Sequence, residues 1–391
     1  MTTVQLTDEQ LVLAQVQPTP EQTAAAWTVL PERVLDLNWA EIALLAIQHR
    51  VEGIVEEALR LSGCADQVSA SVLSTLRRRA DLADARYVAC YDALVALHRQ
   101  APDVVANLVF FKGATLIGLY NAPHHRMLGD FDFIVPEDSY GELRAAFDRL
   151  GFWEKPGRNG PTFFGQAANP QIGCEYVVFD VHRKAPAKYN RTEASLDGLW
   201  LSSTEPYVLG EIECRRLDKD LEMLELLAHM SEHAGSWIHA CLDDDVRLIR
   251  LLDVELLCAS GGVSGARVGE LARRFGLHGE MALGLGLVAA VRGDLPAPLA
   301  ELRELADAAA DLVDAVALPD GRIETWDTPA RQRVFLTNRA ACALRMMPAD
   351  RRHRDDWFDW RRGLIEGQED VAAIARQVRD RLHASANAGQ P

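Results

Sequence analysis

Apolar residues recur at helical spacing on both sides of a central segment. Asn38 can cap a helix, with Glu41 three residues further on as its capping-box partner. The apolar residues that follow at three- or four-residue intervals are Leu44, Ile47, Val51 and Val55. A second helical run covers 66–100, and two further stripes follow position 217. Their members are Leu221, Leu224, Leu227 and Ala228, then Leu248, Leu251, Leu252 and Leu256. The pattern predicts a helical region toward each end of the chain.

The central segment has short apolar runs that are typical of β-strands. A Lys-Gly turn ends the first run and a proline stops the second. The three runs are 108–111, 131–135 and 175–182. Helices are expected between the first two runs and after the second. The predicted organisation is a small α/β core between two helical blocks, with boundaries at 1–103, 104–215 and 216–391.

Composition and charge narrow the choice of partners. Apolar residues make up 48% of the 391 residues, which excludes a mostly disordered chain. The formal net charge of −16 repels phosphate backbones, so non-specific nucleic-acid binding over the whole surface is not expected. Seven scattered cysteines without a CxxC pair indicate reduced thiols, and the N-terminus lacks a secretory signal pattern. The most apolar stretch is about half a membrane span. We therefore expect a cytoplasmic protein with no membrane partner.

Two aspartates alternate with aromatic residues at the second predicted strand, in the sequence GDFDFIV. A period of two places Asp130 and Asp132 on one face, and Phe131 and Phe133 on the other, toward a core. Adjacent carboxylates repel one another, and a cation between them removes that penalty. Oxygen donors of this kind suit Mg²⁺ or Mn²⁺. The pair is therefore predicted to be a metal site.

A third carboxylate lies in the later strand VVFDVH. Asp180 shares its face with His182, while Phe179 and Val181 face the opposite side. If the two strands are neighbours, three carboxylates converge and can hold two metal ions. Such a pair of ions stabilises the attacking and the leaving oxygen of an in-line phosphoryl displacement. The sequence therefore favours phosphoryl-transfer chemistry.

A candidate phosphate-binding turn precedes these aspartates. Gly113 allows a ligand to approach the backbone closely, and the helix after it offers free N–H groups. Lys112 or Thr115 is expected to add a side-chain contact. Arg126 lies four residues before Asp130 and is expected to reach a triphosphate or to orient the turn.

The order of these motifs resembles the nucleotidyltransferase superfamily of the DNA polymerase beta type. It looks closest to the bacterial uncharacterised nucleotidyltransferase family, whose core reads roughly KGA, LY, R and GDxDhhV. The matching residues are Lys112-Gly113-Ala114, Leu119-Tyr120, Arg126 and Gly129 to Val135. The later Asp-x-His strand matches Asp180-Val181-His182, and a helical segment with two histidines and a later Asp matches His229, His233 and Asp253. The resemblance covers roughly 35–260.

The resemblance implies an α+β fold with a small mixed-sheet nucleotidyltransferase core. It implies that Asp130, Asp132 and Asp180 bind Mg²⁺ or Mn²⁺ and are catalytic. The donor would be a nucleoside triphosphate, with ATP as the default. The expected nucleotide-binding residues are Lys112, Gly113, Ala114, Thr115, Arg126 and His182. A hydroxyl, phosphate or carboxylate of an acceptor would attack the α-phosphorus, with Asp180 assisting its deprotonation, and pyrophosphate would leave. Ala114 replaces the usual Ser or Gly, so a hydroxyl contact would have to come from Thr115.

Other functions remain open from the sequence. His229, Glu232 and His233 fit the H-x-x-E-H pattern of inverted zinc peptidases. A non-catalytic protein that binds nucleotide as a regulator is a second alternative. A toxin-type nucleotidyltransferase acting on tRNA or protein is a third, with a basic, aromatic stretch at 345–362 as its candidate surface. A small molecule, peptide or protein is favoured over nucleic acid as acceptor. His124 and His125 are expected in a solvated loop.

Overall fold

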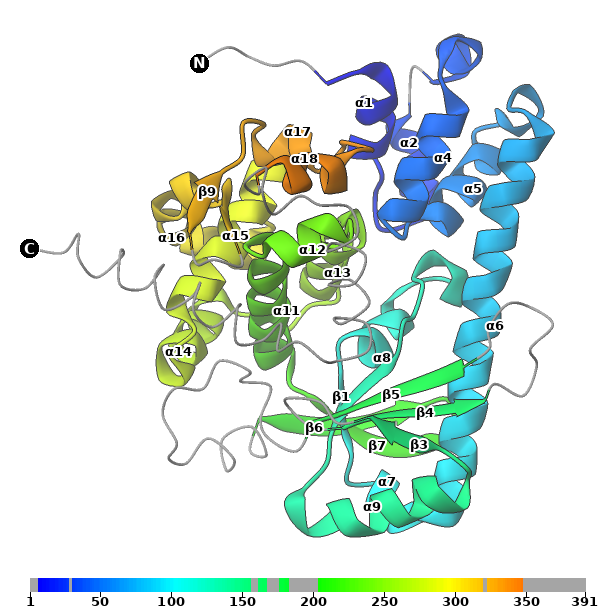
Figure 1. Cartoon of the computed structure of the whole chain (residues 1–391), viewed down its shortest axis with the longest axis vertical. Coiled ribbons are helices and arrows are strands. Elements are labelled where there is room, and N and C mark those ends of the chain that lie inside the picture. Colours follow the sequence, from blue (N-terminus) through cyan, green and yellow to red (C-terminus); the bar gives the residue numbers. More distant parts are fainter. Residues whose placement is uncertain are drawn as a thin grey trace, which may run out of the picture.

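A seven-stranded mixed sheet organises the middle of the chain in a computed structural model, which describes residues 6–27, 30–155, 161–166, 176–182, 203–318 and 322–346 (Figure 1). In spatial order the strands are β3 (Trp153–Lys155), β4 (Thr162–Gln166), β5 (Tyr176–His182), β2 (Phe131–Ile134), β1 (Val109–Phe111), β7 (Ile212–Leu217) and β6 (Thr204–Leu209). The pairs β2–β5 and β1–β7 are parallel, and the other neighbours are antiparallel. The predicted α+β class with a mixed sheet is confirmed.

One face of the sheet is packed with aromatic side chains. Phe110, Phe131, Phe133 and Phe179 are fully buried there in a single hydrophobic cluster. Helices α6 (Ala70–Gln100), α7 (Pro102–Val105) and α9 (Glu137–Arg149) contribute to this cluster, and α7 and α9 lie beneath the sheet in Figure 1. Burying each phenylalanine stabilises the fold by about 1.5–3 kcal/mol. A register slip of one residue would turn Asp132 into this core, so the alternation fixes the opposite face as the polar one.

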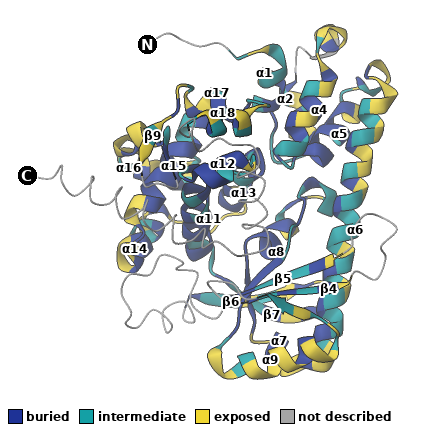
Figure 2. Ribbon diagram, viewed as in Figure 1, coloured by how far each residue is buried: buried dark blue, intermediate teal, exposed yellow. Residues whose placement is uncertain are grey.

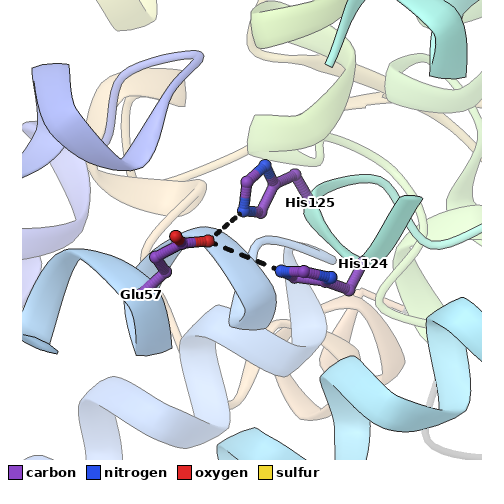
Figure 3. A group of neighbouring side chains, drawn as sticks. All are labelled: Glu57, His124 and His125. Atoms are coloured by element: carbon purple, nitrogen blue, oxygen red, sulfur yellow. Dashed lines mark hydrogen bonds and ion pairs between the residues drawn. The ribbon is translucent and has the colours of Figure 1, made fainter. Parts of the chain in front are cut away.

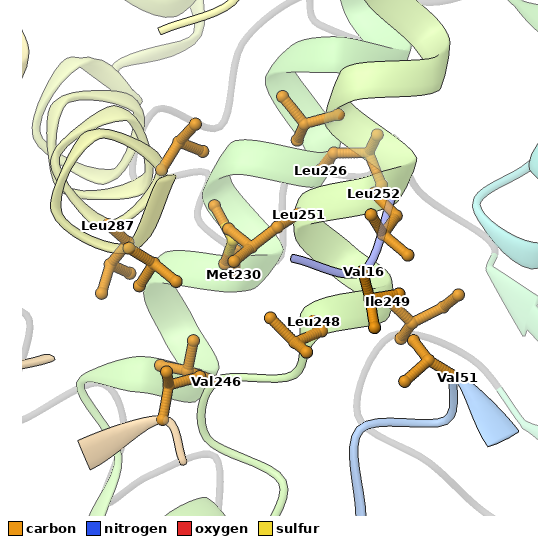
Figure 4. Close-up of a cluster of buried hydrophobic side chains, with 14 of the residues drawn as sticks. Val16, Val51, Leu226, Met230, Val246, Leu248, Ile249, Leu251, Leu252 and Leu287 are labelled. Carbon is orange, nitrogen blue, oxygen red and sulfur yellow. The ribbon is translucent and has the colours of Figure 1, made fainter. Parts of the chain in front are cut away.

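The two helical regions meet in one shared hydrophobic core on the other side of the sheet. Val16 and Val51 from the N-terminal region belong to the same buried cluster as Leu226, Ile249 and Leu252 from the C-terminal region (Figure 4). The N-terminal helices are α1 (Asp8–Ala14), α2 (Pro20–Ala26), α3 (Leu30–Arg33), α4 (Trp39–Gln48) and α5 (Glu52–Leu61). The two regions flank the core along the chain as predicted, but in space they meet on one side of the sheet, and residues of both line a cavity there.

The C-terminal region is helical as expected, with one small two-stranded sheet. Its helices are α11 (Lys219–Ala234), α12 (Trp237–Cys241), α13 (Leu248–Ala259), α14 (Gly265–Phe275), α15 (His278–Arg292), α16 (Arg303–Ala308), α17 (Ala330–Arg333) and α18 (Arg339–Arg345), and its strands are β8 (Ala315–Ala317) and β9 (Ile323–Thr325). Helices α11 and α13 are mostly buried, whereas α14 exposes one face (Figure 2). No helix in the described ranges is long and apolar enough to cross a membrane.

The first apolar stripe forms two helices instead of one. Asn38 caps α4 as predicted, because its Oδ1 accepts from the Glu41 amide at 3.3 Å. The helix then stops, and Arg50 takes a positive φ of 58° before α5 begins. Leu44 is 47% exposed, so it does not belong to the buried stripe. The break is important because it places Arg50 at the space between the helical regions and the sheet.

The hairpin β6–β7 was not predicted from the sequence. Its strands carry charged residues such as Glu205, Arg215 and Arg216, so the apolar run that marked the other strands is missing. Neighbouring strands satisfy the backbone here, and Arg216 pairs with Glu205 across the hairpin at 2.5 Å. Most of the basic, aromatic stretch at 345–362 lies outside the described residues.

Candidate active site

The parallel pairing of β2 with β5 brings two of the predicted aspartates side by side. Asp132 lies directly opposite Asp180, and Ile134 lies opposite His182. One ligand atom each of Asp132, Asp180 and His182 falls within 4.8 Å of the others. These three residues are therefore on one face, as the period-two alternation predicted, and they form a cluster able to hold a metal ion.

Asp130 lies just before β2 and faces a cavity of about 100 Å³ that Asp132 also lines. It is not a member of the three-residue cluster. Burial and the negative charges of Asp132 and Asp180 raise the pKa of Asp130 to about 7. A divalent cation bound beside Asp130 would offset this repulsion between the carboxylates.

Lys112 places a positive charge next to Asp132. Its Nζ lies 2.9 Å from Asp132 Oδ1 and 4.0 Å from Oε1 of Glu225 on α11. Burial opposes the charged form, but the carboxylates of Asp132 and Glu225 outweigh it and raise the pKa of Lys112. Its backbone φ of +53° is unfavourable for a lysine. This conformation turns the chain from the end of β1 into the short helix α8 (Gly113–Leu116). Two of the three non-glycine positive-φ residues in the described ranges, Arg50 and Lys112, line the same cavity.

His182 connects the two strand aspartates. Its Nε2 lies 3.3 Å from Asp132 Oδ1 and 3.3 Å from Asp180 Oδ2. Burial lowers the pKa of His182, but the hydrogen bonds to both carboxylates prevail and raise it. The same contacts help to hold the pKa values of Asp132 and Asp180 below the ordinary value, against the effect of burial. Thr162 adds a hydrogen bond from its Oγ1 to Asp180 Oδ1 at 3.3 Å.

Arg126 is held in place by a carboxylate from the C-terminal region. Its Nε and Nη2 each donate to Asp253 at 2.8 Å, and the hydroxyl of Tyr120 donates to the same carboxylate at 2.9 Å. A Cβ on Gly113 would lie 2.9 Å from Arg126 Nη1 and 2.7 Å from Leu128. Only glycine therefore fits at position 113 while Arg126 keeps this orientation. The fold explains the matched Asp253 as the residue that positions Arg126.

The two residues after Gly113 point into the interior. Ala114 is fully buried, and neither it nor Thr115 lines the cavity. The hydroxyl of Thr115 donates to the Lys112 carbonyl at 3.0 Å and also contacts Glu222 Oε1. The single proton of the hydroxyl can go to either acceptor. Burial raises the pKa of Glu222 to about 7, against the effect of the Thr115 hydroxyl. The expected Thr115 contact to phosphate would require this hydroxyl to turn away from Glu222.

Three arginines that the site prediction did not include line the same cavity. Arg50 comes from the break after α4, while Arg247 and Arg250 come from the start of α13. Asp244 pairs with Arg250 at 2.7 Å and with Arg247 at 3.0 Å. Burial and the neighbouring Arg50 lower the pKa of Arg247 to about 9, and its Nε has no hydrogen-bond partner among the described residues. The cavity therefore combines carboxylates on one side with a concentration of positive charge suited to an anion.

The histidines of the zinc-peptidase pattern do not form a metal cluster. Within the described ranges, neither group of ligands able to hold a metal includes His229, Glu232 or His233. His233 Nδ1 lies 2.9 Å from the Asp244 carbonyl and 3.0 Å from Arg250 Nη2, a cationic neighbour that disfavours a metal ion there. His229 lines the cavity. Glu232 and His233 do not line it.

A family model described as uncharacterised nucleotidyltransferase matches residues 36–293. The chain belongs to this family. The match begins before the Arg50 break and ends after α15, so it includes the sheet and both helical walls of the cavity. Family membership supports nucleotidyl transfer in general and a nucleotide substrate. No curated protein and no solved structure shows a significant match.

Proposed function

We propose that this chain is a metal-dependent nucleotidyltransferase that moves a nucleoside monophosphate from a triphosphate, ATP in the first instance, to an acceptor. The observation that carries the proposal is one cavity in which Asp130 and Asp132 face Arg50, Arg126 and Arg247. Carboxylates that bind cations and arginines that bind phosphate oxygens are the two halves of a site for a metal–triphosphate complex. The proposal includes the broader assignment to the DNA polymerase beta-type superfamily and a bacterial, cytoplasmic setting.

The carboxylate side of the cavity fits Mg²⁺ or Mn²⁺. Asp130, Asp132 and Asp180 would hold the ion through oxygen atoms, the donors that both metals prefer. The raised pKa of Asp130 supports this fit, because burial and the charges of Asp132 and Asp180 outweigh the nearby Lys112 and Arg50, and a bound cation would favour the charged form. When bound, the ion would neutralise charge on the phosphates and orient their oxygens.

The cationic side of the cavity would bind the triphosphate. Arg126 is oriented by Asp253, so its guanidinium is already fixed before a ligand arrives. Arg247 Nε has no acceptor within the described part of the chain, and a phosphate oxygen would supply one. Gly113 would allow the phosphate to approach the backbone, while Lys112 and His182 would orient Asp132. Ala114 would take part through its backbone alone.

The chemical step follows from these positions. An acceptor oxygen would form a bond to the α-phosphorus as the bond to the bridging oxygen breaks, and the β- and γ-phosphates would leave as pyrophosphate. Asp180 would take the acceptor proton, because it is the most exposed of the clustered ligands at 30% and its low pKa keeps it ionised. The negative surface charge favours a small molecule, peptide or protein as acceptor over nucleic acid.

The direct test uses each of the four triphosphates labelled at the α-phosphate, together with Mg²⁺ and cell extract. We expect label to appear on one class of acceptor and pyrophosphate to be released. Asp132→Asn should abolish the transfer, while Asp138→Asn, a change at the start of α9 outside the site, should leave it intact. Transfer by Asp132→Asn at the wild-type rate would refute the assignment. Label on RNA would favour the toxin-type alternative. Nucleotide binding without transfer would favour the regulatory one.

A further inference from the structure

A second group of possible metal ligands lies between the N-terminal helices and the loop that leads to Arg126. His124 and His125 belong to the short helix η4 (Pro123–His125), and Glu57 lies on α5. His125 Nε2 is 2.7 Å from Glu57 Oε2, and His124 Nε2 is 3.5 Å from the same oxygen (Figure 3). The prediction of a solvated loop is wrong for His125, which is only 2% exposed. The turn is packed against α5 instead.

The spacing of these three atoms fits a tetrahedral zinc ion. Zinc bonds to imidazole nitrogen and carboxylate oxygen are about 2.0–2.1 Å long, so neighbouring ligand atoms lie about 3.3 Å apart in a tetrahedron. The distances of 2.7 and 3.5 Å bracket that value. All three ligand atoms fall within 4.8 Å of one another.

His124 also has the outer partner that zinc-binding histidines usually have. Its Nδ1 lies 3.1 Å from Asp84 Oδ2 on α6, and donation to this carboxylate would leave the lone pair on Nε2. His124 Nε2 is buried and has no hydrogen-bond partner among the described residues, although it is aimed at Glu57. A buried imidazole nitrogen without a partner is costly, and a metal ion would satisfy it.

The backbone holds the ligands together before any ion binds. A Cβ on Gly53 would lie 2.0 Å from the carbonyl oxygen of His124, so glycine is required for η4 to rest on α5. The side chains of Glu57 and His124 are 28% and 17% exposed, so one side of the group opens to solvent. That opening provides an entry path and room for a water molecule as the fourth ligand.

We propose that Glu57, His124 and His125 form a zinc site that joins α5 to the loop before Arg126. Two imidazole nitrogens and one carboxylate favour zinc over Mg²⁺, which prefers oxygen ligands. The site is separate from the strand carboxylates, because it uses no residue of the Asp132 cluster. None of these three residues lines the charged cavity, so we assign the ion a structural role: it would fix the residue that immediately precedes Arg126.

Metal content of the purified full-length chain, with any histidine tag removed, tests the site. We expect about one zinc per chain by elemental analysis, and Co²⁺ substitution should give the visible absorption of a tetrahedral nitrogen–oxygen site. His125→Gln should lose stoichiometric zinc. Asp84→Asn should weaken zinc binding about 10- to 100-fold, as expected for an outer partner. His98→Gln, which changes a histidine elsewhere on α6, is the matched control and should retain zinc.

Two results would overturn the site. The first is an apoprotein that takes up no stoichiometric zinc on titration. The second is unchanged zinc affinity in both His125→Gln and Asp84→Asn. Asp84 is 42% exposed, so its variant is expected to fold even if His125→Gln does not. Zinc affinity is measured without nucleotide, so the outcome is independent of the proposed transfer reaction.

Discussion

The two groups of possible metal ligands differ in how their charges are already balanced. In the sheet, Asp132 contacts the ammonium of Lys112 and the ring of His182, so side chains of the protein already neutralise part of its negative charge. Between the helices, His124 has a buried nitrogen with no hydrogen-bond partner among the described residues. The first group is rich in oxygen and open to a charged cavity, whereas the second combines nitrogen with oxygen and lies apart from that cavity.

This difference indicates two separate tasks. A catalytic metal site has to admit a charged substrate and exchange partners during turnover, and the arginines opposite the strand carboxylates suit that requirement. A structural site needs only to hold two elements together, and η4 already rests on α5 through Gly53. The two groups are adjacent along the chain, because His125 is followed directly by Arg126. They share no residue, however, so a substitution in one group should leave metal binding by the other unchanged.

Asp130→Asn is expected to give the largest difference between the two groups, because it should abolish most of the transfer activity and leave zinc binding unchanged. We expect nucleotide transfer to fall by about a thousandfold or more, because the variant loses a charged ligand on the cavity side. The folded protein should be as stable as wild type or more stable above about pH 7. The pKa of Asp130 is raised to about 7, so ionisation costs folding free energy as the pH rises through that value, and asparagine avoids the cost.

Transfer assays, thermal melts and zinc analysis on the same preparation check this prediction. Zinc content should stay at the wild-type level, since Asp130 is not part of the histidine group. Loss of zinc would show that the two groups are not independent, and a variant that melts well below wild type above about pH 7 would contradict the cost of ionising Asp130.

A smaller effect is expected on the cationic side of the cavity. Arg247→Ala should weaken triphosphate binding by about 10- to 150-fold, because a hydrogen bond to a charged group is worth about 1.5–3 kcal/mol. Binding of Mg²⁺ alone should change little. Arg303→Ala, which removes an arginine from an exposed ion pair, is the control and should bind as wild type does. Calorimetric titration with a non-hydrolysable triphosphate measures the change, and equal affinities would remove Arg247 from the phosphate site.

The strand side of the site could be predicted from the sequence because its signal is local. Alternation placed Phe131 and Phe133 in the core and Asp132 opposite them, and the same rule placed Asp180 and His182 on one face. Short-range patterns of this kind depend only on strand geometry. The order of strands in the sheet was left open by the pattern and follows from the packing.

The helical walls were not predictable in the same way. Arg50 reaches the cavity because α4 breaks, although the apolar stripe continues in sequence through that break. The Arg126–Asp253 and Glu57–His125 contacts join residues that are more than sixty positions apart in the sequence. Such contacts depend on which helices meet, and no local period encodes that. The hairpin β6–β7 was missed because its charged strands lack an apolar run.

The smallest effect is expected from substituting Glu222, and it should appear in the free energy of unfolding. Glu222 is a buried carboxyl close to the sheet but outside both metal groups. Burial raises its pKa from 4.5 to about 7, so the folded state favours the protonated form. Its contribution to stability is full below about pH 4.5 and is lost as the pH rises through about 7. Glu222→Gln keeps a donor toward Thr115 and does not ionise. It should therefore be more stable than wild type by about 1–3 kcal/mol above about pH 7, and equal to it below about pH 4.5. Denaturant melts across this range measure the difference. A constant difference at all pH values would mean that the pKa of Glu222 is the same in the folded and unfolded states, which would contradict the effect of burial argued here.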